Sequence, residues 1–199
     1  MARIKSAWEL ALEKTKDIQV DTEKIAHDEK VQAGRKLAAN FLSDYQQSPK
    51  DLAAELDKIP AKDKDTTLEG VLAVILDNIS LPMTKDYQQP YQRVRQLASV
   101  LGNPGLDQGL EQIGQFFDQY LQQQDDITDQ VKQQYAPRLE QKQAQLRQQY
   151  GQDITLQPEQ DPDFLKMLDA TLKKLDAQYT GALTRFKSQL KALFPFCPQ

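Results

Sequence analysis

The sequence predicts an all-α protein, a multi-helix bundle with a long C-terminal antiparallel helical hairpin. Apolar residues recur at spacings of three and four along most of the chain, β-branched residues are few, and no long segment alternates apolar and polar residues. Clustered glutamines, as in LQQQ at 121–124, fill helix surfaces without adding charge. We divide the chain into a compact bundle over residues 1–124 and a hairpin over residues 125–199 that packs on the bundle or projects from it.

The N-terminal segment carries its own helix signals. Ser6 and Glu9 have the spacing of a capping box, and Trp8, the single tryptophan of the chain, lies between them. We expect a short helix here, with Trp8 as the packing anchor that holds it against the helix over 31–45 or the one over 68–79.

The second predicted helix runs from Asp21 or Thr22 to about Tyr45. Gly34 lies on or near its apolar stripe, although glycine in a helix costs about 1 kcal/mol relative to alanine. We therefore expect the backbone of a partner helix to approach closely at Gly34.

Punctuation residues define the next two helices. Ser48 as N-cap, Pro49 at the first helical position and Pro60 as terminator predict one short helix. Residues 61–65, AKDKD, are interpreted as a charged linker. Thr66 then opens the most apolar helix of the chain, which we place at the centre of the core.

Two further helices complete the predicted bundle. An apolar stripe over 87–101 indicates the first of them, and Pro90 begins its firm part or kinks it. The GNPG sequence at 102–105 predicts a turn. The helix after that turn is expected to end at about Gln124.

The hairpin is predicted from two longer helices. The first runs from Asp126 to Gly151, and Pro137 must kink or interrupt it. In the second, Asp161 caps a helix that begins at Pro162 and extends over about 32 residues, or about 48 Å. Such a length approaches that of a coiled-coil arm.

Charge and cysteine content restrict the class of protein. The formal net charge of −4 argues against a nucleic-acid partner, because phosphate contacts need a basic surface. One cysteine, Cys197, cannot form an intrachain disulfide, which fits a reducing compartment. The sequence has no secretory signal and no apolar run of about 20 residues, so we expect a cytoplasmic protein without a transmembrane segment.

Residues that carry catalysis are scarce, and we expect no catalytic site, metal or cofactor. His27 is the only histidine, and the simplest interpretation is an exposed helical residue among charges. One cysteine and one histidine cannot complete a structural zinc site, and no phosphate-binding loop or nucleophile elbow is present. These observations favour a non-enzymatic protein.

The last helix presents two surfaces that could bind a partner. Its apolar stripe is an expected interface with another part of this chain or with another subunit, through Leu165, Leu168, Leu172, Leu175, Tyr179, Phe186 and Leu190. Its basic side is an expected contact for an anionic surface, through Lys173, Lys174, Lys187 and Lys191. The first hypothesis is therefore a helical interaction or scaffold protein, either self-associating or bound to another protein. The alternative is a peripheral membrane or anionic-ligand binder that uses residues 162–194.

The opening residues SAWELALEKT, at 6–15, resemble the N-terminus of an uncharacterised family of small bacterial helical proteins. In that family a Ser-Ala-Trp-Glu start leads into a short helix. The resemblance implies a bacterial cytoplasmic source and gives no information about catalytic residues.

Overall fold

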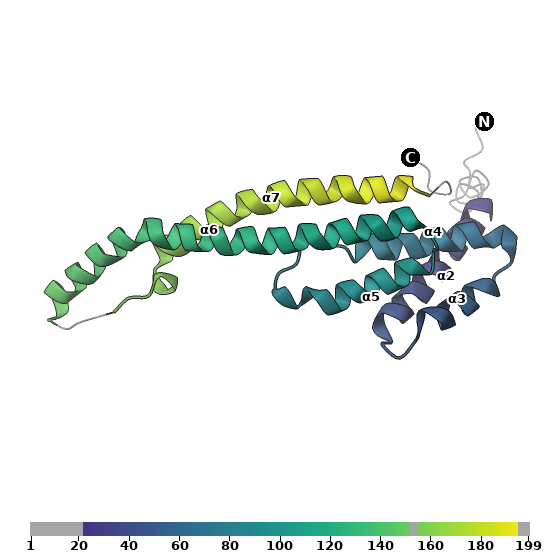
Figure 1. Cartoon of the computed structure of the whole chain (residues 1–199), viewed down its shortest axis with the longest axis horizontal. Coiled ribbons are helices and arrows are strands. Elements are labelled where there is room, and N and C mark those ends of the chain that lie inside the picture. Colours follow the sequence, from purple (N-terminus) through teal and green to yellow (C-terminus); the bar gives the residue numbers. More distant parts are fainter. Residues whose placement is uncertain (1–21, 152–154, 195–199) are drawn as a thin grey trace, which may run out of the picture.

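The computed structural model describes residues 22–151 and 155–194, and these are folded into helices (Figure 1). The described ranges contain six α-helices and two short 3-10 helices without a strand, so the all-α prediction is confirmed. The predicted capping box at Ser6 and Glu9, the packing anchor Trp8, and Cys197 lie outside the described residues.

Four helices and one 3-10 turn form the compact end of the molecule (Figure 1). They are α2 (Thr22–Ser43), α3 (Pro49–Asp57), α4 (Ala61–Asp77), η1 (Lys85–Tyr87) and α5 (Gln88–Ser99). The main core lies between these helices and the N-terminal part of the next one, and it includes Phe41, Leu72, Ile75 and Leu97, which are almost fully buried.

The helices α2 and α4 cross in direct backbone contact. A Cβ atom on Gly34 would lie 1.9 Å from the carbonyl oxygen of Thr67, and one on Gly70 would lie 2.1 Å from that of Val31. Each glycine thus admits the backbone of the other helix, and the close approach expected at Gly34 is confirmed. Sequence analysis did not single out Gly70.

The predicted charged linker at 61–65 is wrong, because these residues form the first turns of α4. Ion pairs hold this end of the helix to its neighbours: Lys30 of α2 binds Asp63, and Lys64 lies 2.9 Å from Asp57 of α3. The side chain of Thr67 turns back to the carbonyl oxygen of Asp63. These contacts stabilise a helical start that has a high charge density.

The predicted break between Gln124 and Asp126 is also wrong. A single helix, α6, runs from Pro104 to Tyr150 through the proposed domain boundary. Asn103 caps its start, and Gly151 ends it in the left-handed conformation at φ 67°, as predicted. Pro137 lies inside this helix without interrupting it, and the C-terminal part, green in Figure 1, bends away from the line of the rest.

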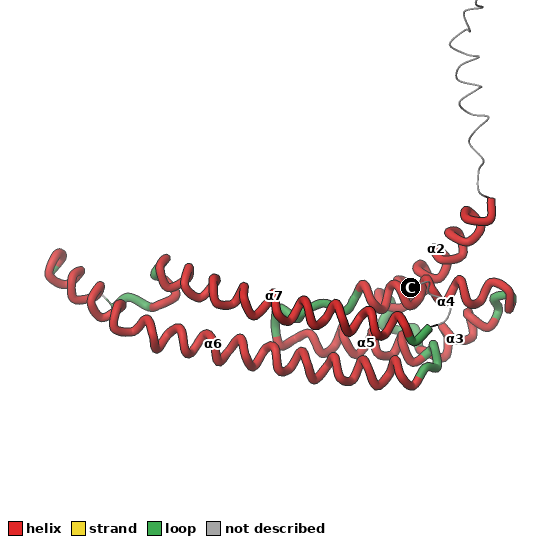
Figure 2. The backbone as a smooth tube through the Cα atoms, turned by 90° about the horizontal axis from the view of Figure 1, so that it is seen from above, coloured by secondary structure: helices red, strands yellow, loops and turns green. Residues whose placement is uncertain are grey.

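The last helix, α7 (Pro162–Ala192), lies antiparallel along α6, as Figures 1 and 2 show. The predicted cap at Asp161 and start at Pro162 are confirmed, after a short η2 turn (Pro158–Gln160). The sequence left open whether the hairpin packs on the bundle or projects from it, and the α6–α7 pair does both. One half of the pair packs on the bundle, where Leu183 and Leu190 join the main core, and the other half extends beyond the bundle as an arm.

A buried polar network fastens α7 to α6 in the arm. The Asp161 carboxylate, only 2% exposed, accepts hydrogen bonds from the Tyr135 hydroxyl at 2.7 Å and from Nζ of Lys142 at 2.8 Å. The ammonium of Lys142, the Tyr135 hydroxyl and the backbone N–H of Asp163 together lower the pKa of Asp161 to about 2. The Phe164 ring packs against Tyr135, with centroids 5.6 Å apart.

Candidate functional site

The structure places most of the predicted α7 interface inside this chain. Leu175 and Leu190 are buried, and the side chain of Leu190 fills the space left by Gly109 of α6. Leu168, Leu172, Tyr179 and Phe186 are half-buried. The partner of this stripe, left open by the sequence, is therefore α6 and the bundle of the same chain.

Leu165 alone among the predicted interface residues is exposed, at 46%. Phe164 takes the buried position instead, because the Tyr135 ring on α6 supports it. Leu165, the next residue of α7, is rotated from Phe164 by about 100° around the helix.

The four predicted anion-contacting lysines are in unequal environments. Lys173 is bound to Asp169 at 2.7 Å, and this hydrogen bond raises the pKa of Lys173. Lys187 is half-buried, and its burial lowers its pKa. Lys174 and Lys191 are exposed.

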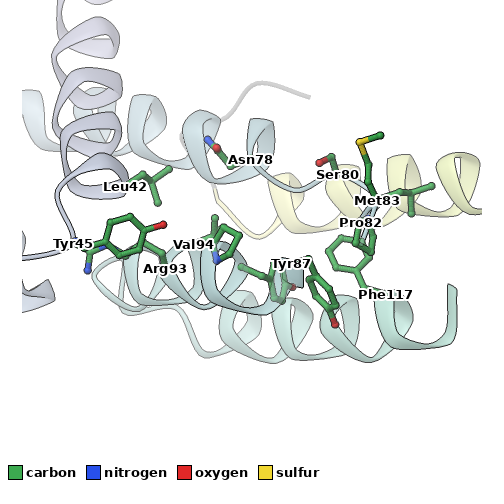
Figure 3. A pocket seen from close by; sticks show the side chains of 13 residues that line it. Leu42, Tyr45, Asn78, Ser80, Pro82, Met83, Tyr87, Arg93, Val94 and Phe117 are labelled. Atoms are coloured by element: carbon green, nitrogen blue, oxygen red, sulfur yellow. The ribbon is translucent and has the colours of Figure 1, made fainter. Parts of the chain in front are cut away.

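A hollow that sequence analysis did not predict lies where α2, the end of α4 and α5 meet. It is called here the Met83 groove, and its cavity volume is about 310 Å³. Figure 3 shows its lining: Leu42, Tyr45, Asn78, Ser80, Leu81, Pro82, Met83, Tyr87, Pro90, Tyr91, Arg93, Val94 and Phe117. The sequence signal for it is slight, since Pro82 and Met83 lie between two predicted helices, outside any apolar stripe.

The rim of the Met83 groove is apolar and exposed. Met83 is 94% exposed and Tyr45 is 55% exposed, although both are large apolar side chains. Single exposed apolar residues are common in proteins, but these two border the same hollow, at opposite ends of it in Figure 3.

Aromatic rings form the deeper wall of the groove. The Phe117 ring meets Tyr87 edge-on at a centroid distance of 5.5 Å and Tyr91 at 5.3 Å. The Tyr87 hydroxyl donates to Asp118 at 2.6 Å, and that of Tyr91 donates to the carbonyl oxygen of Leu110. Burial, the main cause, raises the pKa values of both phenols. Both hydroxyls are therefore fixed, neutral structural groups.

Arg93 holds the α2 side of the groove in place. Its guanidinium donates to the carbonyl oxygens of Phe41, Asp44 and Gln47, at 2.6–3.0 Å, where α2 ends and the chain turns. It also lies 3.6 Å from the centroid of the Phe41 ring. A cation at these C-terminal carbonyls is favourable, because the helix dipole is negative there. Arg93 thus fixes the position of Tyr45, two residues beyond α2.

A second hollow, of about 480 Å³, lies on the other side of Tyr87 and Tyr91, along the seam of α5 and α6. Charged side chains, Arg95, Glu111 and Asp118, take part in its lining, and Gly114 leaves space. The two tyrosines therefore lie between the Met83 groove and a hollow that has charged side chains.

The polar side chains on the Met83 groove are an amide, hydroxyls and a guanidinium engaged with carbonyl oxygens. Among the described residues no group of three His, Cys, Asp or Glu side chains is arranged to hold a metal. His27 does not line either hollow. It is exposed on α2, with its Nε2 atom 3.4 Å from a carboxylate oxygen of Glu69, in agreement with the predicted exposed helical histidine.

None of the helices in the described part of the chain combines the length and the apolar character that a membrane span requires.

Comparison with known proteins gives one match. Residues 53–192 match the model of a protein family described as a family of unknown function (DUF6657). This span begins in α3, includes α6 and α7, and contains the lining of both hollows except Leu42 and Tyr45 of the Met83 groove. No curated protein and no solved structure matches the chain significantly.

Proposed function

The chain belongs to DUF6657, a family of unknown function, and we propose that it is a non-enzymatic helical interaction protein that seats an apolar side chain of a partner in the Met83 groove. A bacterial source and a cytoplasmic location are part of the same proposal. The observation that carries it is the pairing of an exposed apolar rim, Met83 and Tyr45, with an apolar hollow.

The size of the groove indicates what it holds. Pockets for complete small ligands occupy about 300–1,000 Å³, and the Met83 groove lies at the lower end of that range. It suits one or two side chains of a partner protein. Methionine adapts its shape to different apolar surfaces, and tyrosine is enriched among residues that dominate binding energy.

Site-specific photocrosslinking tests the proposal in cells. A benzophenone amino acid at position 83 should form a discrete crosslinked product with a partner protein, whereas the same group at Ala54, exposed on α3, should not. A matched pair of substitutions identifies the groove. Tyr45→Glu should reduce the product about thirtyfold, the effect of losing about 2 kcal/mol at a dominant contact.

Tyr150→Glu is the control, because Tyr150 is also exposed, at 60%, but lies at the end of α6. It should leave the crosslinked product unchanged. If position 83 gives no product, or if both glutamate variants reduce it equally, the proposal is wrong.

The alternative, an anionic membrane surface contacted by α7, has less support. Two of its four lysines are already engaged or half-buried, namely Lys173 and Lys187. Flotation with anionic vesicles separates the two ideas, since the Met83 groove predicts no vesicle binding.

A further inference from the structure

One edge of α6 carries a straight row of carboxylates, called here the acidic edge. Its members are Asp107, Glu111, Asp118, Asp125 and Asp129, all of them exposed. Spacings of four and seven residues bring these side chains to one face of the helix, over about 33 Å at 1.5 Å per residue. Residues 104–131 contain no lysine or arginine, so α6 itself supplies no counter-charge to this edge.

Two hollows lie along the acidic edge. The 480 Å³ hollow has carboxylates of Glu111 and Asp118 beside the rings of Tyr87 and Tyr91. A smaller one, of about 170 Å³, follows between Tyr87 and Asp125. Cationic side chains of this chain already line both hollows, Arg95 the larger one and Lys85, which is bound to Asp125, the smaller one. Ammonium groups bind favourably to carboxylates and to aromatic faces, so the rest of the acidic edge is suited to the lysine side chains of a partner.

A complementary row lies on α7 of the same chain, called here the lysine edge. It consists of Lys166, Lys173, Lys187 and Lys191, at spacings of seven, fourteen and four residues. Lys173 is bound to Asp169 and Lys187 is half-buried, so Lys166 and Lys191, both exposed, are the members that carry the proposed contact. These spacings again define one face, over about 38 Å. The two edges therefore match in length and have opposite charge.

The two edges of one molecule face different sides and do not meet. The acidic edge lies beside η1 and α5, as shown by the bonds from Lys85 to Asp125 at 2.8 Å and from Tyr87 to Asp118. The lysine edge is on α7, where Asp77 of α4 contributes a nearby charge to Lys187. Figure 1 shows α7 and α5 on opposite sides of α6.

We propose that the acidic edge of one copy binds the lysine edge of a second copy. Because the two edges are different surfaces on opposite sides, the association is head-to-tail and produces either a ring or an open chain of copies. This interface goes beyond the proposed function, since it uses a surface separate from the Met83 groove. Exposed charges are screened by salt, so the assembly is stable at low ionic strength and dissociates at high ionic strength.

Light scattering coupled to size-exclusion chromatography tests the full chain at about 100 µM. At about 0.05 M salt the mass should exceed the 22.7 kDa of one chain, and at about 1 M salt it should fall to that value. A wild-type protein that is monomeric at low salt overturns the proposal.

Charge reversal identifies the two edges. One variant combines Asp107→Lys, Glu111→Lys and Asp129→Lys, which avoids the carboxylates bound to Lys85 and Tyr87. The other combines Lys166→Glu and Lys191→Glu. Each variant alone should be monomeric at low salt, and a mixture of the two should assemble again, because each altered edge then meets an edge of opposite charge.

The matched control reverses two lysines elsewhere, Lys36→Glu and Lys50→Glu, which are exposed on α2 and α3 and change the net charge by the same amount as the lysine-edge variant. It should assemble like the wild type. Circular dichroism verifies that every variant is folded. A mixture that stays monomeric, or a control that also dissociates, contradicts the proposal, and Met83→Glu should leave assembly unchanged.

Discussion

The guanidinium of Arg93 lies 3.6 Å from the ring centroid of Phe41 and donates two hydrogen bonds to the carbonyl oxygen of the same residue. This one side chain, 6% exposed, joins α5 to the end of α2. Its hydrogen bonds go to backbone carbonyl oxygens and to the side-chain amide oxygen of Gln96. The end of α2, and with it one side of the Met83 groove, depends on this contact.

Replacement of Arg93 should therefore destabilise the bundle. Arg93→Ala removes hydrogen bonds from a charged donor and leaves buried carbonyl oxygens unpaired, so we expect a loss of about 3 kcal/mol in the free energy of unfolding. Arg93→Lys should lose about half as much, because an ammonium cannot reproduce the planar fork. Urea unfolding measures both, with exposed Arg138→Ala as a control that changes stability by less than about 0.5 kcal/mol.

The crossing of α2 and α4 should not tolerate a single added methyl group. Gly34→Ala and Gly70→Ala each place a Cβ atom about 2 Å from a backbone oxygen, and the two helices must then separate. We expect each change to cost about 3 kcal/mol in thermal or urea unfolding. Gly181→Ala is the matched control, because nothing lies within 4 Å of that position and alanine favours the helix by about 0.5–1 kcal/mol. Equal effects at all three glycines would contradict the backbone contact.

The Asp161 network should make the stability of the arm depend on pH in the acidic range. The pKa of Asp161 is about 2 in the folded protein, below its ordinary value of 3.8, chiefly because of Lys142. The stabilisation is thus complete above pH 4 and is lost as the pH falls from about 4 to about 2. The melting temperature of the wild type should fall more steeply over this window than that of Asp161→Asn. Exposed Asp129→Asn should retain the wild-type slope.

Pro137 should weaken the outer part of α6. Proline lacks the backbone N–H that would bind the carbonyl oxygen of residue 133, and its ring opposes a straight helix. Pro137→Ala should slow amide hydrogen exchange over residues 133–145 by about tenfold or more, since proline costs about 3 kcal/mol inside a helix. Exchange in α4 should be unaffected, and uniform slowing across the chain would contradict a local effect.

Sequence pattern predicted the helices that carry local signals. Ser48 with Pro49, Gly151, and Asp161 with Pro162 all stand where the structure begins or ends a helix. The helix start predicted at Asp126 was wrong, because an aspartate also tolerates an exposed position inside a helix. Just before Asp126, Tyr120 packs on α7 and its hydroxyl donates to Asp176 at 2.7 Å. This contact stabilises α6 on the N-terminal side of Asp126, and the helix continues without a break.

The candidate site was beyond sequence reasoning for a different reason. The Met83 groove joins residues from α2, the α4–α5 connection, α5 and α6, and no spacing in the chain relates Tyr45 to Phe117. Arg93 was equally hidden, since an arginine beside an apolar stripe ordinarily points to water. Only the tertiary arrangement shows that its charge replaces an ordinary helix cap.

The uninterrupted course of α6 has a mechanical consequence. Its 47 residues span about 70 Å and connect the tip of the arm to the centre of the bundle. Leu190 of α7 is seated on Gly109 near one end, and the Lys142–Asp161 contact fastens α7 near the other. The two helices are therefore held together at two separate points along their length. A force applied at the tip of the arm would reach the bundle as a torque, with bending concentrated at Pro137.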